Sequence, residues 1–282
     1  MYNTLKKNRI LEMLGRKEVP LGMQVFTCHP ALIEIIGLTG FDFVMLDTEH
    51  SPNSARDMET AIRAADGVGL TTFVRVSSHD DESDIHRALE AGAMGIFLPL
   101  VKSAADIRRA ADAAYFPMKG KRGVCPSLRA AGYNWNNFDQ YAAWNNEEVI
   151  LIPMIEQVEA MENIEEICAM EEVKIIVFAG GDLAYAMGEA SRMMASPLVQ
   201  AAYRKVMETA KRHGVHVIGG PVLDPTPAGC RKALDDGVTI MCLGLDTMSF
   251  RQVCEATVKA LNTGVEGTEF TRAPAPPSGF KS

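Results

Sequence analysis

The sequence lacks the features of a nucleic-acid-binding or membrane protein. Its 282 residues carry a net charge of −8, and lysine and arginine occur only in short groups such as Lys6-Lys7, so no basic face for phosphates is expected. No apolar run approaches the roughly 20 residues that span a bilayer. The N-terminal stretch MYNTLKKNRILEMLGRK is too polar for a signal peptide. These absences predict a soluble cytoplasmic protein with neither nucleic acid nor a membrane as partner.

Cysteine and glycine motifs are also missing. The six cysteines are far apart, with no CxxC pair and no histidine at zinc-finger spacing, so reduced and mostly buried thiols are expected. After the first predicted strand, residues 27–30 read TCHP, which is not the GxGxxG turn of a dinucleotide-binding sheet. A doubly wound open sheet is therefore only the second choice for the fold.

What is present is a regular alternation of short apolar runs and longer segments with helical periodicity. Such alternation favours parallel strands joined by helices, and eight units predict a closed (β/α)8 barrel, the TIM barrel of the α/β class. The predicted strands are Leu21–Phe26, Phe43–Asp47, Thr72–Val76, Gly95–Pro99, Ile150–Ile155, Lys174–Phe178, Val215–Gly219 and Thr239–Leu243. The predicted helices are Leu5–Leu14, Pro30–Ile36, Ala55–Ala65, Glu82–Ala91, Ala104–Ala114, Val158–Met170, Leu198–His213, Pro225–Asp236 and Asp246–Leu261.

Two segments interrupt this alternation. Residues 115–149 are too long for an ordinary connection, and such a segment is usually functional or carries short elements of its own. The sequence from Gly264 onward ends in TRAPAPPSGFKS, whose proline, alanine and glycine predict an extended or disordered arm. We therefore expect one barrel domain, residues 1–263, followed by a tail, residues 264–282.

Polar residues follow several predicted strands, at the end of a barrel where active sites are found. Asp47, Glu49 and His50 come at and after the end of the second strand, and Arg75 lies in the third. Each has a structural alternative, because aspartate often caps a helix and arginine pairs with neighbouring carboxylates. An unpaired guanidinium in an apolar strand is costly, so Arg75 should meet an anion, either a structural carboxylate or a substrate.

These residue types suggest one kind of chemistry. A carboxylate can orient an imidazole and raise its basicity, so His50 beside Asp47 is a candidate base. Glu156 and Asp182 follow strands five and six without a cysteine or histidine, and oxygen ligands alone favour Mg²⁺ or Mn²⁺, although both residues could instead stabilise helix N-termini. A divalent ion, Arg75 and a base would together suit a 2-oxo acid whose enolate is stabilised by the metal.

The stretch FDFVMLDTEHSPNS, residues 41–54, resembles the FDxxxxDxEHxP signature of the HpcH/HpaI aldolase family, the metal-dependent class II pyruvate aldolases. The resemblance extends over residues 5–262 and implies a (β/α)8 barrel, often with its last helix exchanged between subunits, assembled as a homo-oligomeric trimer or hexamer. Further similar stretches, in the family's order and spacing, are VRVSS at 74–78, IPMIEQVEAMENIEEI at 152–167, VFAGGDLAYAMG at 177–188 and CLGLDT at 242–247.

The resemblance also implies roles for individual residues. His50 resembles the family's catalytic base and Asp47 its dyad partner. Arg75 resembles the arginine that binds the pyruvate carboxylate and steadies the enolate. Glu156 and Asp182 resemble the two protein ligands of Mg²⁺, Mn²⁺ or Co²⁺.

Other positions follow the family pattern with differences. Glu90 falls where the family has an acidic residue that tunes the histidine, often across a subunit boundary, and Gly181 where a backbone amide contacts the pyruvate carboxylate. Met154 stands where many members have a substrate-contacting glutamine. Gln24 lies in the first predicted strand, near its substrate-facing positions, where the family has a tryptophan. Glu49 is expected to hold His50 or a neighbouring subunit in place. These departures leave the metal ligands and the base unchanged, and put the usual sugar-acid or heptenedioate substrates in doubt.

The leading hypothesis is a carbon–carbon lyase that cleaves a 4-hydroxy-2-oxo acid to pyruvate and an aldehyde. An alternative reaction uses the same enolate, either after decarboxylation of oxaloacetate or for capture by another electrophile, as in macrophomate synthase of the same family. A barrel that binds a metabolite without catalysis is a third alternative. It predicts damage to the metal pair or the base, and the sequence shows neither.

Overall fold

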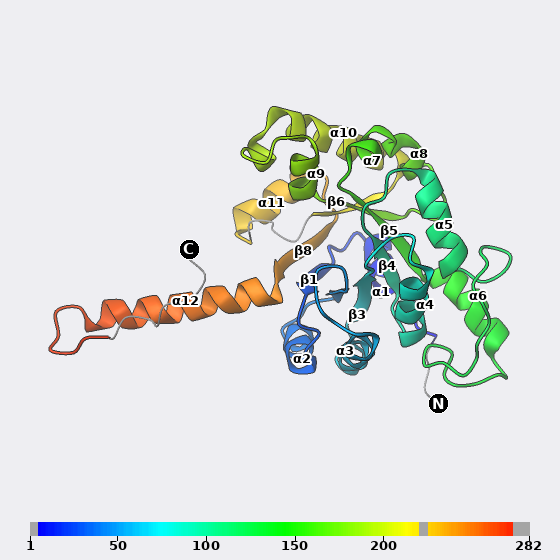
Figure 1. The fold of residues 1–282 in the computed structure, drawn as a ribbon, viewed down its shortest axis with the longest axis horizontal. Helices are drawn as coiled ribbons and strands as arrows, with labels where there is room; N and C mark the ends of the chain where they lie inside the picture. Colours follow the sequence, from blue (N-terminus) through cyan, green and yellow to red (C-terminus); the bar gives the residue numbers. More distant parts are fainter. Residues whose placement is uncertain (1–4, 220–224, 273–282) are drawn as a thin grey trace. The chain divides into compact units, whose positions relative to one another are not determined.

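A computed structural model describes residues 5–219 and 225–272, and its parallel strands close into a barrel in the order β1 to β8 (Figure 1). The predicted TIM barrel is thereby confirmed, and each predicted strand overlaps an observed one. The strands are β1 (Leu21–Val25), β2 (Phe43–Asp47), β3 (Thr71–Arg75), β4 (Gly95–Leu98), β5 (Ile150–Ile155), β6 (Ile175–Phe178), β7 (His216–Gly219) and β8 (Ile240–Leu245).

The strands are apolar on both faces because both faces are buried. In β2, Phe43 and Met45 belong to an apolar cluster inside the barrel, whereas Val44 and Leu46 belong to the cluster between the strands and the surrounding helices. Successive side chains of a strand point to opposite faces, so Asp47 also faces the inside, at the carboxyl end of β2. The barrel interior is therefore filled with apolar side chains below and opens onto charged ones at its mouth.

The helices begin at residues that the sequence marks as caps. At α3 the Ser54 hydroxyl accepts from the Asp57 amide while the Asp57 carboxylate accepts from the Ser54 amide, and Asp81 caps α4 in a similar way. The helices around the barrel are α1 (Arg9–Gly15), α2 (Pro30–Leu38), α3 (Ala55–Gly67), α4 (Glu82–Ala91), α5 (Ala104–Ala114), α6 (Phe138–Glu148), α7 (Val158–Glu162), α8 (Ile164–Cys168), α9 (Gly180–Ala186), α10 (Pro197–His213) and α11 (Pro227–Asp235), and β8 is followed by α12 (Asp246–Val265).

Several predicted helices have different bounds in the structure. The helix predicted over residues 158–170 is divided at Asn163, where α7 ends and α8 begins. The first helix starts at Arg9 rather than Leu5, because the side chain of Asn8 accepts the amide of Leu11 and caps it. The helix predicted over residues 225–236 is observed as α11, which begins two residues later, at Pro227.

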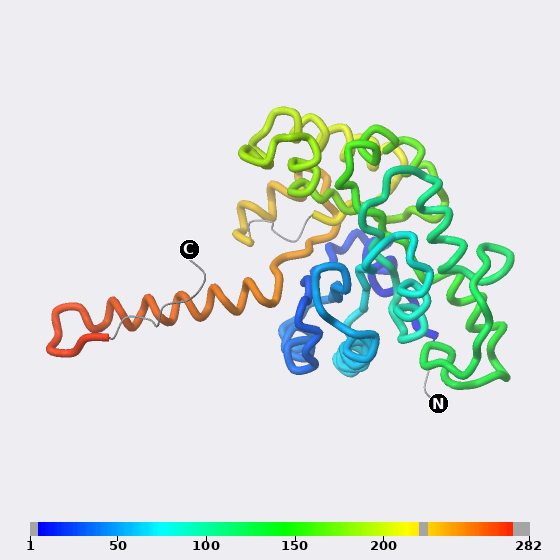
Figure 2. The backbone as a smooth tube through the Cα atoms, viewed as in Figure 1, coloured from blue at the N-terminus to red at the C-terminus, as the bar shows by residue number. Residues whose placement is uncertain are grey.

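The long segment 115–149 contains α6, preceded by irregular loops that Figure 2 shows beside it in green. It joins the end of α5 to the start of β5, so it lies at the amino-terminal ends of the strands. Asn8 ties it to the start of the chain, since its backbone amide donates to Glu148 Oε2 at 2.7 Å and its side chain donates to the Glu148 carbonyl at 2.9 Å. Within one chain the segment is therefore at the opposite end of the barrel from the mouth.

The chain divides into two compact units, one ending at Asp246 and one beginning at Thr247. The predicted boundary was at residue 263, because the sequence gives α12 the same helical pattern as the helices around the barrel. In the parts of the chain that the structure describes, no helix is both long enough and apolar enough to cross a membrane.

Candidate active site

Asp47 and Arg75 form a buried ion pair at the carboxyl ends of β2 and β3. The strand register places them directly opposite each other. Arg75 Nε donates to Asp47 Oδ1 at 3.1 Å and Arg75 Nη2 donates to Oδ2 at 2.5 Å, and the two residues are only 7% and 0% exposed. The anion that Arg75 requires is therefore a structural carboxylate, held by two parallel hydrogen bonds.

The carboxylate of Glu49 lies between Arg75 and His50. Its Oε2 is 3.1 Å from Arg75 Nη1 and 3.5 Å from His50 Nε2. Burial raises the pKa of Glu49, and the positive charges of Arg75 and His50 act against that rise. The side chain of His50 is 63% exposed, so its ring is accessible to a molecule in the mouth. The contacts of Arg75 with the two carboxylates leave N–H groups of its guanidinium for a further anion.

The structure differs from the predicted pairing of the His50 ring with Asp47. Arg75 contacts both carboxylate oxygens of Asp47, and Oδ1 also accepts the backbone amides of Glu49 at 2.8 Å and His50 at 3.3 Å. Asp47 thus holds the backbone of the turn that carries His50. Among the described residues, the carboxylate that contacts the imidazole is that of Glu49.

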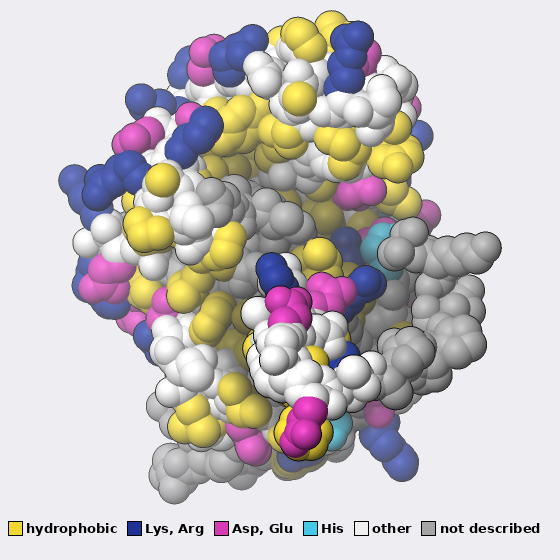
Figure 3. Space-filling view, turned by 90° about the vertical axis from the view of Figure 1, so that its left-hand side faces the viewer, with side chains coloured by type: hydrophobic (Ala, Val, Ile, Leu, Met, Phe, Trp, Pro, Cys, Tyr) yellow, Lys and Arg dark blue, Asp and Glu magenta, His cyan; other side chains and the backbone are white. Residues whose placement is uncertain are grey.

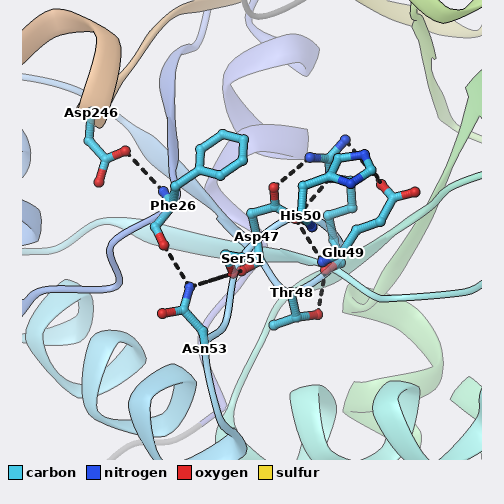
Figure 4. A network of polar contacts seen from close by, with 9 residues as sticks. Phe26, Asp47, Thr48, Glu49, His50, Ser51, Asn53 and Asp246 are labelled. Carbon is cyan, nitrogen blue, oxygen red and sulfur yellow. Dashed lines mark hydrogen bonds and ion pairs between the residues drawn. The ribbon is translucent and has the colours of Figure 1, made fainter. Parts of the chain in front are cut away.

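The turn that carries His50 is bonded to neighbouring loops (Figure 4). Asn53 Nδ2 donates to the backbone oxygens of Phe26 at 2.8 Å and Asp47 at 3.1 Å, and the hydroxyl of Ser51 also donates to the Asp47 oxygen. The amide of Phe26 in turn donates to Asp246 Oδ1 at 3.0 Å. These hydrogen bonds connect the His50 turn to the loop after β1 and give its buried backbone groups partners.

Glu156 follows β5 and is 3% exposed. Burial, together with the negative charges of Glu49 and Asp182, raises its pKa to about 7. A hydrogen bond of 2.5 Å from the amide of Leu100 to Glu156 Oε1 and the charge of Arg75 act in the opposite direction. The carboxylates from three different loops therefore lie close enough to influence one another.

Four further predicted residues, all except Glu90, lie at or below the same mouth. Asp182 is exposed in the first turn of α9, next to the half-buried Gly181. Met154 in β5 is buried in the cluster inside the barrel. Gln24 is buried in β1, in register with Met45 of that cluster, so it faces the same interior.

Glu156 and Asp182 fit a site for a divalent cation. The negative charges of Glu49 and Asp182 help to raise the pKa of Glu156, and a cation beside its carboxylate would offset that repulsion. In residues 5–219 and 225–272, no group of three or more His, Cys, Asp or Glu side chains could hold a metal ion. Water and substrate oxygens would have to complete the shell, which is common for Mg²⁺.

Comparison with known proteins shows the family of the chain. Residues 21–253 match the family model described as HpcH/HpaI aldolase/citrate lyase. The chain belongs to this family. Its homologues are aldolases, so it is an enzyme of the carbon–carbon lyase class.

Individual relatives cover nearly the whole chain. The 5-keto-4-deoxy-D-glucarate aldolase of Klebsiella pneumoniae is 29% identical over 260 residues, which are 92% of this chain and 99% of that protein. An HpcH/HpaI aldolase from Desulfitobacterium hafniense has a similar structure, with a TM-score of 0.83, 25% identity, and coverage of 93% of this chain and 99% of that one. Macrophomate synthase shares the fold at a TM-score of 0.80 and 24% identity, with coverage of 92% and 90%.

Glu90 lies away from the other candidate residues in this HpcH/HpaI chain. It is in the last turn of α4, and its backbone oxygen accepts the amide of Ala130 at 3.1 Å. Burial is the main cause of the raised pKa of Tyr141 in α6, and the charge of Glu90 adds to that rise. A helix that follows a barrel strand runs back to the amino-terminal ends of the strands, opposite His50. A role for Glu90 beside a catalytic histidine stays a prediction that requires a neighbouring subunit.

Two groups support the site through contacts that the sequence does not display. The amide of Leu100 donates to Glu156, and backbone amides leave no signal in a sequence. Asn53 follows the His50 turn, where its amide could have been recognised as a donor for loop carbonyls, but which carbonyls accept depends on the fold.

We expect removal of Arg75 to be costly for both stability and activity. Arg75→Ala leaves the Asp47 carboxylate buried without its guanidinium, which should lower the free energy of unfolding by about 3–5 kcal/mol and abolish lyase activity. Arg75→Lys keeps a charge but not the double contact, so it should fold with a smaller loss and lose most of its activity. Urea unfolding and steady-state kinetics measure both effects.

Arg16→Ala is the matched control, because Arg16 contacts Glu18 through the same two nitrogens, Nε at 3.0 Å and Nη2 at 2.8 Å, but on the surface. Its removal should leave stability nearly unchanged. Equal losses in Arg16→Ala and Arg75→Ala would show that burial does not give the Asp47–Arg75 pair its importance.

The raised pKa of Glu156 predicts that the free energy of unfolding of the metal-free protein depends on pH. The pKa of Glu156 is about 7 in the folded state against 4.5 in the reference state, so its contribution is fully present below pH 4.5 and is lost as the pH rises through 7. Glu156→Gln cannot ionise, and should gain up to about 3 kcal/mol relative to the wild type between pH 5 and pH 8.

Urea unfolding in EDTA at these two pH values measures this gain, and Glu147→Gln, at an exposed position, is the control that should show none. A difference between Glu156→Gln and the wild type that is the same at both pH values would contradict the raised pKa.

Proposed function

We propose that the chain catalyses retro-aldol cleavage of a 4-hydroxy-2-oxo acid to pyruvate and an aldehyde. The observation that carries this proposal is the convergence of Arg75, His50 and the carboxylates of Glu49 and Glu156 at one barrel mouth. A guanidinium with free donors suits the 2-oxo acid's carboxylate, and an exposed imidazole suits a hydroxyl proton.

The metal ion is part of the proposal. Glu156 and Asp182 would hold Mg²⁺, Mn²⁺ or Co²⁺, whose chemistry is to polarise the 2-oxo group and stabilise negative charge that develops on its oxygen. The two carboxylates come from neighbouring strands, β5 and β6, and the chemistry of oxygen donors supports such a cation.

The protein's own side chains would carry the remaining steps. Arg75, held in place by Asp47, would orient the substrate by its carboxylate. His50, with its ring beside Glu49, would take the proton of the C4 hydroxyl, directly or through water, as the C3–C4 bond breaks. The same proton would then return to C3 of the enolate, which gives pyruvate and leaves His50 ready for the next cycle. Glu49 would favour the protonated imidazole between these steps.

The relatives suggest which class of substrate to test first. A 5-keto-4-deoxy-D-glucarate aldolase among them makes an acidic deoxy sugar the first substrate to test. Met154 and Gln24 face the barrel interior below the mouth, and they are the departures from the family pattern nearest to where pyruvate would bind.

Decarboxylation of oxaloacetate is a second candidate for the same site. Oxaloacetate presents the same 2-oxo carboxylate, and loss of carbon dioxide gives the same enolate. That reaction needs no base to start it, however, and the exposed His50 beside Glu49 would have no use in its first step. We therefore favour the aldol reaction.

We also propose a homo-oligomer, a trimer or hexamer, in which α12 packs against another subunit. Large apolar side chains of α12 are exposed, which is uncommon for an isolated helix in water. Figure 3 shows hydrophobic side chains between charged ones on one face of the molecule. The exposed apolar residues of α12 are Met248, Phe250, Val253, Val258 and Leu261.

Metal removal tests the proposed function. Protein dialysed against EDTA should release no pyruvate from a 4-hydroxy-2-oxo acid, and added Mg²⁺, Mn²⁺ or Co²⁺ should restore the release. Glu156→Gln and Asp182→Asn should not recover at the same metal concentration, whereas Glu159→Gln, a control at an exposed site three residues away, should recover fully. Pyruvate is measured by coupled reduction to lactate. Full activity after complete metal removal would contradict the mechanism.

A further inference from the structure

The backbone of Leu100, two residues beyond the end of β4, has an unusual conformation. Its φ of 55° lies in the left-handed region, which residues other than glycine rarely adopt, and its side chain is 43% exposed. Packing of the side chain therefore does not explain the conformation. The result of the conformation is that the amide of Leu100 donates to Oε1 of Glu156 at 2.5 Å.

The carbonyl of the same peptide group is also bonded. Pro99 contributes the oxygen of the Pro99–Leu100 peptide, and this oxygen lies 2.9 Å from Nδ1 of His79. A carbonyl oxygen can only accept a hydrogen bond, so Nδ1 carries the ring proton. One rigid peptide plane thus links His79 to Glu156, with a hydrogen bond at each end.

His79 is well placed to hold this peptide. It follows β3, four residues after Arg75, and it reaches the end of β4, which lies between β3 and β5 in the barrel. The other ring nitrogen, Nε2, is 3.7 Å from Oδ1 of Asp106. Asp106 is itself fixed at the start of α5, where it accepts the amides of Lys102 at 2.8 Å and Ser103 at 2.9 Å.

We propose that His79 is a positioning residue for Glu156, acting through the Pro99–Leu100 peptide. It fixes the direction of the Leu100 amide and so the orientation of the carboxylate that would bind the divalent ion. The inference rests on the proposed function for its consequence, metal affinity, but not for the hydrogen-bond chain itself.

Two physical effects support this role. A hydrogen bond to a peptide oxygen polarises the peptide and strengthens the hydrogen bond that its N–H donates. In addition, partners that orient a metal ligand commonly change metal affinity or activity by about 10–100-fold when they are removed. His79 acts one group further from the ion than such a partner, so the lower end of this range, about tenfold, is expected.

The variants His79→Leu and His79→Asn separate positioning from packing. The two replacements are similar in size, but asparagine places an N–H group where histidine has Nδ1, whereas leucine has no donor. Ser78→Ala is the control in the same loop, because the Ser78 hydroxyl donates to Asp80 and not to the peptide. Unfolding midpoints of all variants check that each is folded.

Two readouts are needed, and one does not depend on metal. Calorimetric titration of the metal-free protein with Mn²⁺ measures ion affinity. Hydrogen exchange in EDTA, followed by NMR of the Leu100 amide signal, reports the Leu100 hydrogen bond directly. His79→Leu should bind Mn²⁺ about tenfold more weakly and exchange faster at Leu100, while His79→Asn and Ser78→Ala should resemble the wild type.

The outcomes distinguish this inference from the proposed function. If His79→Leu and His79→Asn give the same exchange and the same affinity, the donor of His79 does not position Glu156 and the inference is wrong. If affinity falls but exchange at Leu100 is unchanged, the peptide does not transmit the effect, which also overturns it. If the wild type binds no Mn²⁺ while exchange rises only in His79→Leu, the positioning stands and the metal-dependent function fails.

Discussion

The buried ion pair of Asp47 and Arg75 is the constraint on which the mouth of the barrel depends. Both charges leave water, and each is compensated only while the two parallel contacts are kept. The register of β2 and β3 provides that geometry, and a slip of one residue would turn one charge out of the barrel. With the pair in place, Asp47 fixes the turn that carries His50, and Glu49 joins the guanidinium to the imidazole.

The fold, and with it the convergence of Arg75 and Glu156 at one end of the barrel, could be predicted because both follow from local pattern. Apolar runs separated by helical segments specify a parallel barrel, and the carboxyl ends of its strands meet at one place, so Arg75 and Glu156 had to converge there. The partner of His50 could not be predicted in the same way. Asp47 and Glu49 are two residues apart, and both contact Arg75. The sequence does not show which of the two carboxylates also remains close to the imidazole of His50.

Other features depend on groups or neighbours that a sequence does not display. The hydrogen bond to Glu156 comes from the backbone of Leu100, and its geometry depends on the contact between His79 and Pro99 in a different loop. The position of Glu90 at the end of α4 follows from the direction of the helix, whereas the family resemblance predicts a place for it in the site. The geometry of a single chain and the family resemblance therefore give different positions for Glu90 relative to the site.

The central claim is that the mouth stabilises a pyruvate enolate with the help of a divalent ion. Exchange of the methyl protons of pyruvate in deuterated water, followed by proton NMR, measures enolate formation without any aldehyde. The wild type with Mg²⁺ should catalyse this exchange, whereas EDTA-treated wild type and Glu156→Gln with Mg²⁺ should not. Exchange by the metal-free wild type at an undiminished rate, or its absence from the wild type supplied with Mg²⁺, Mn²⁺ and Co²⁺ in turn, would contradict the account.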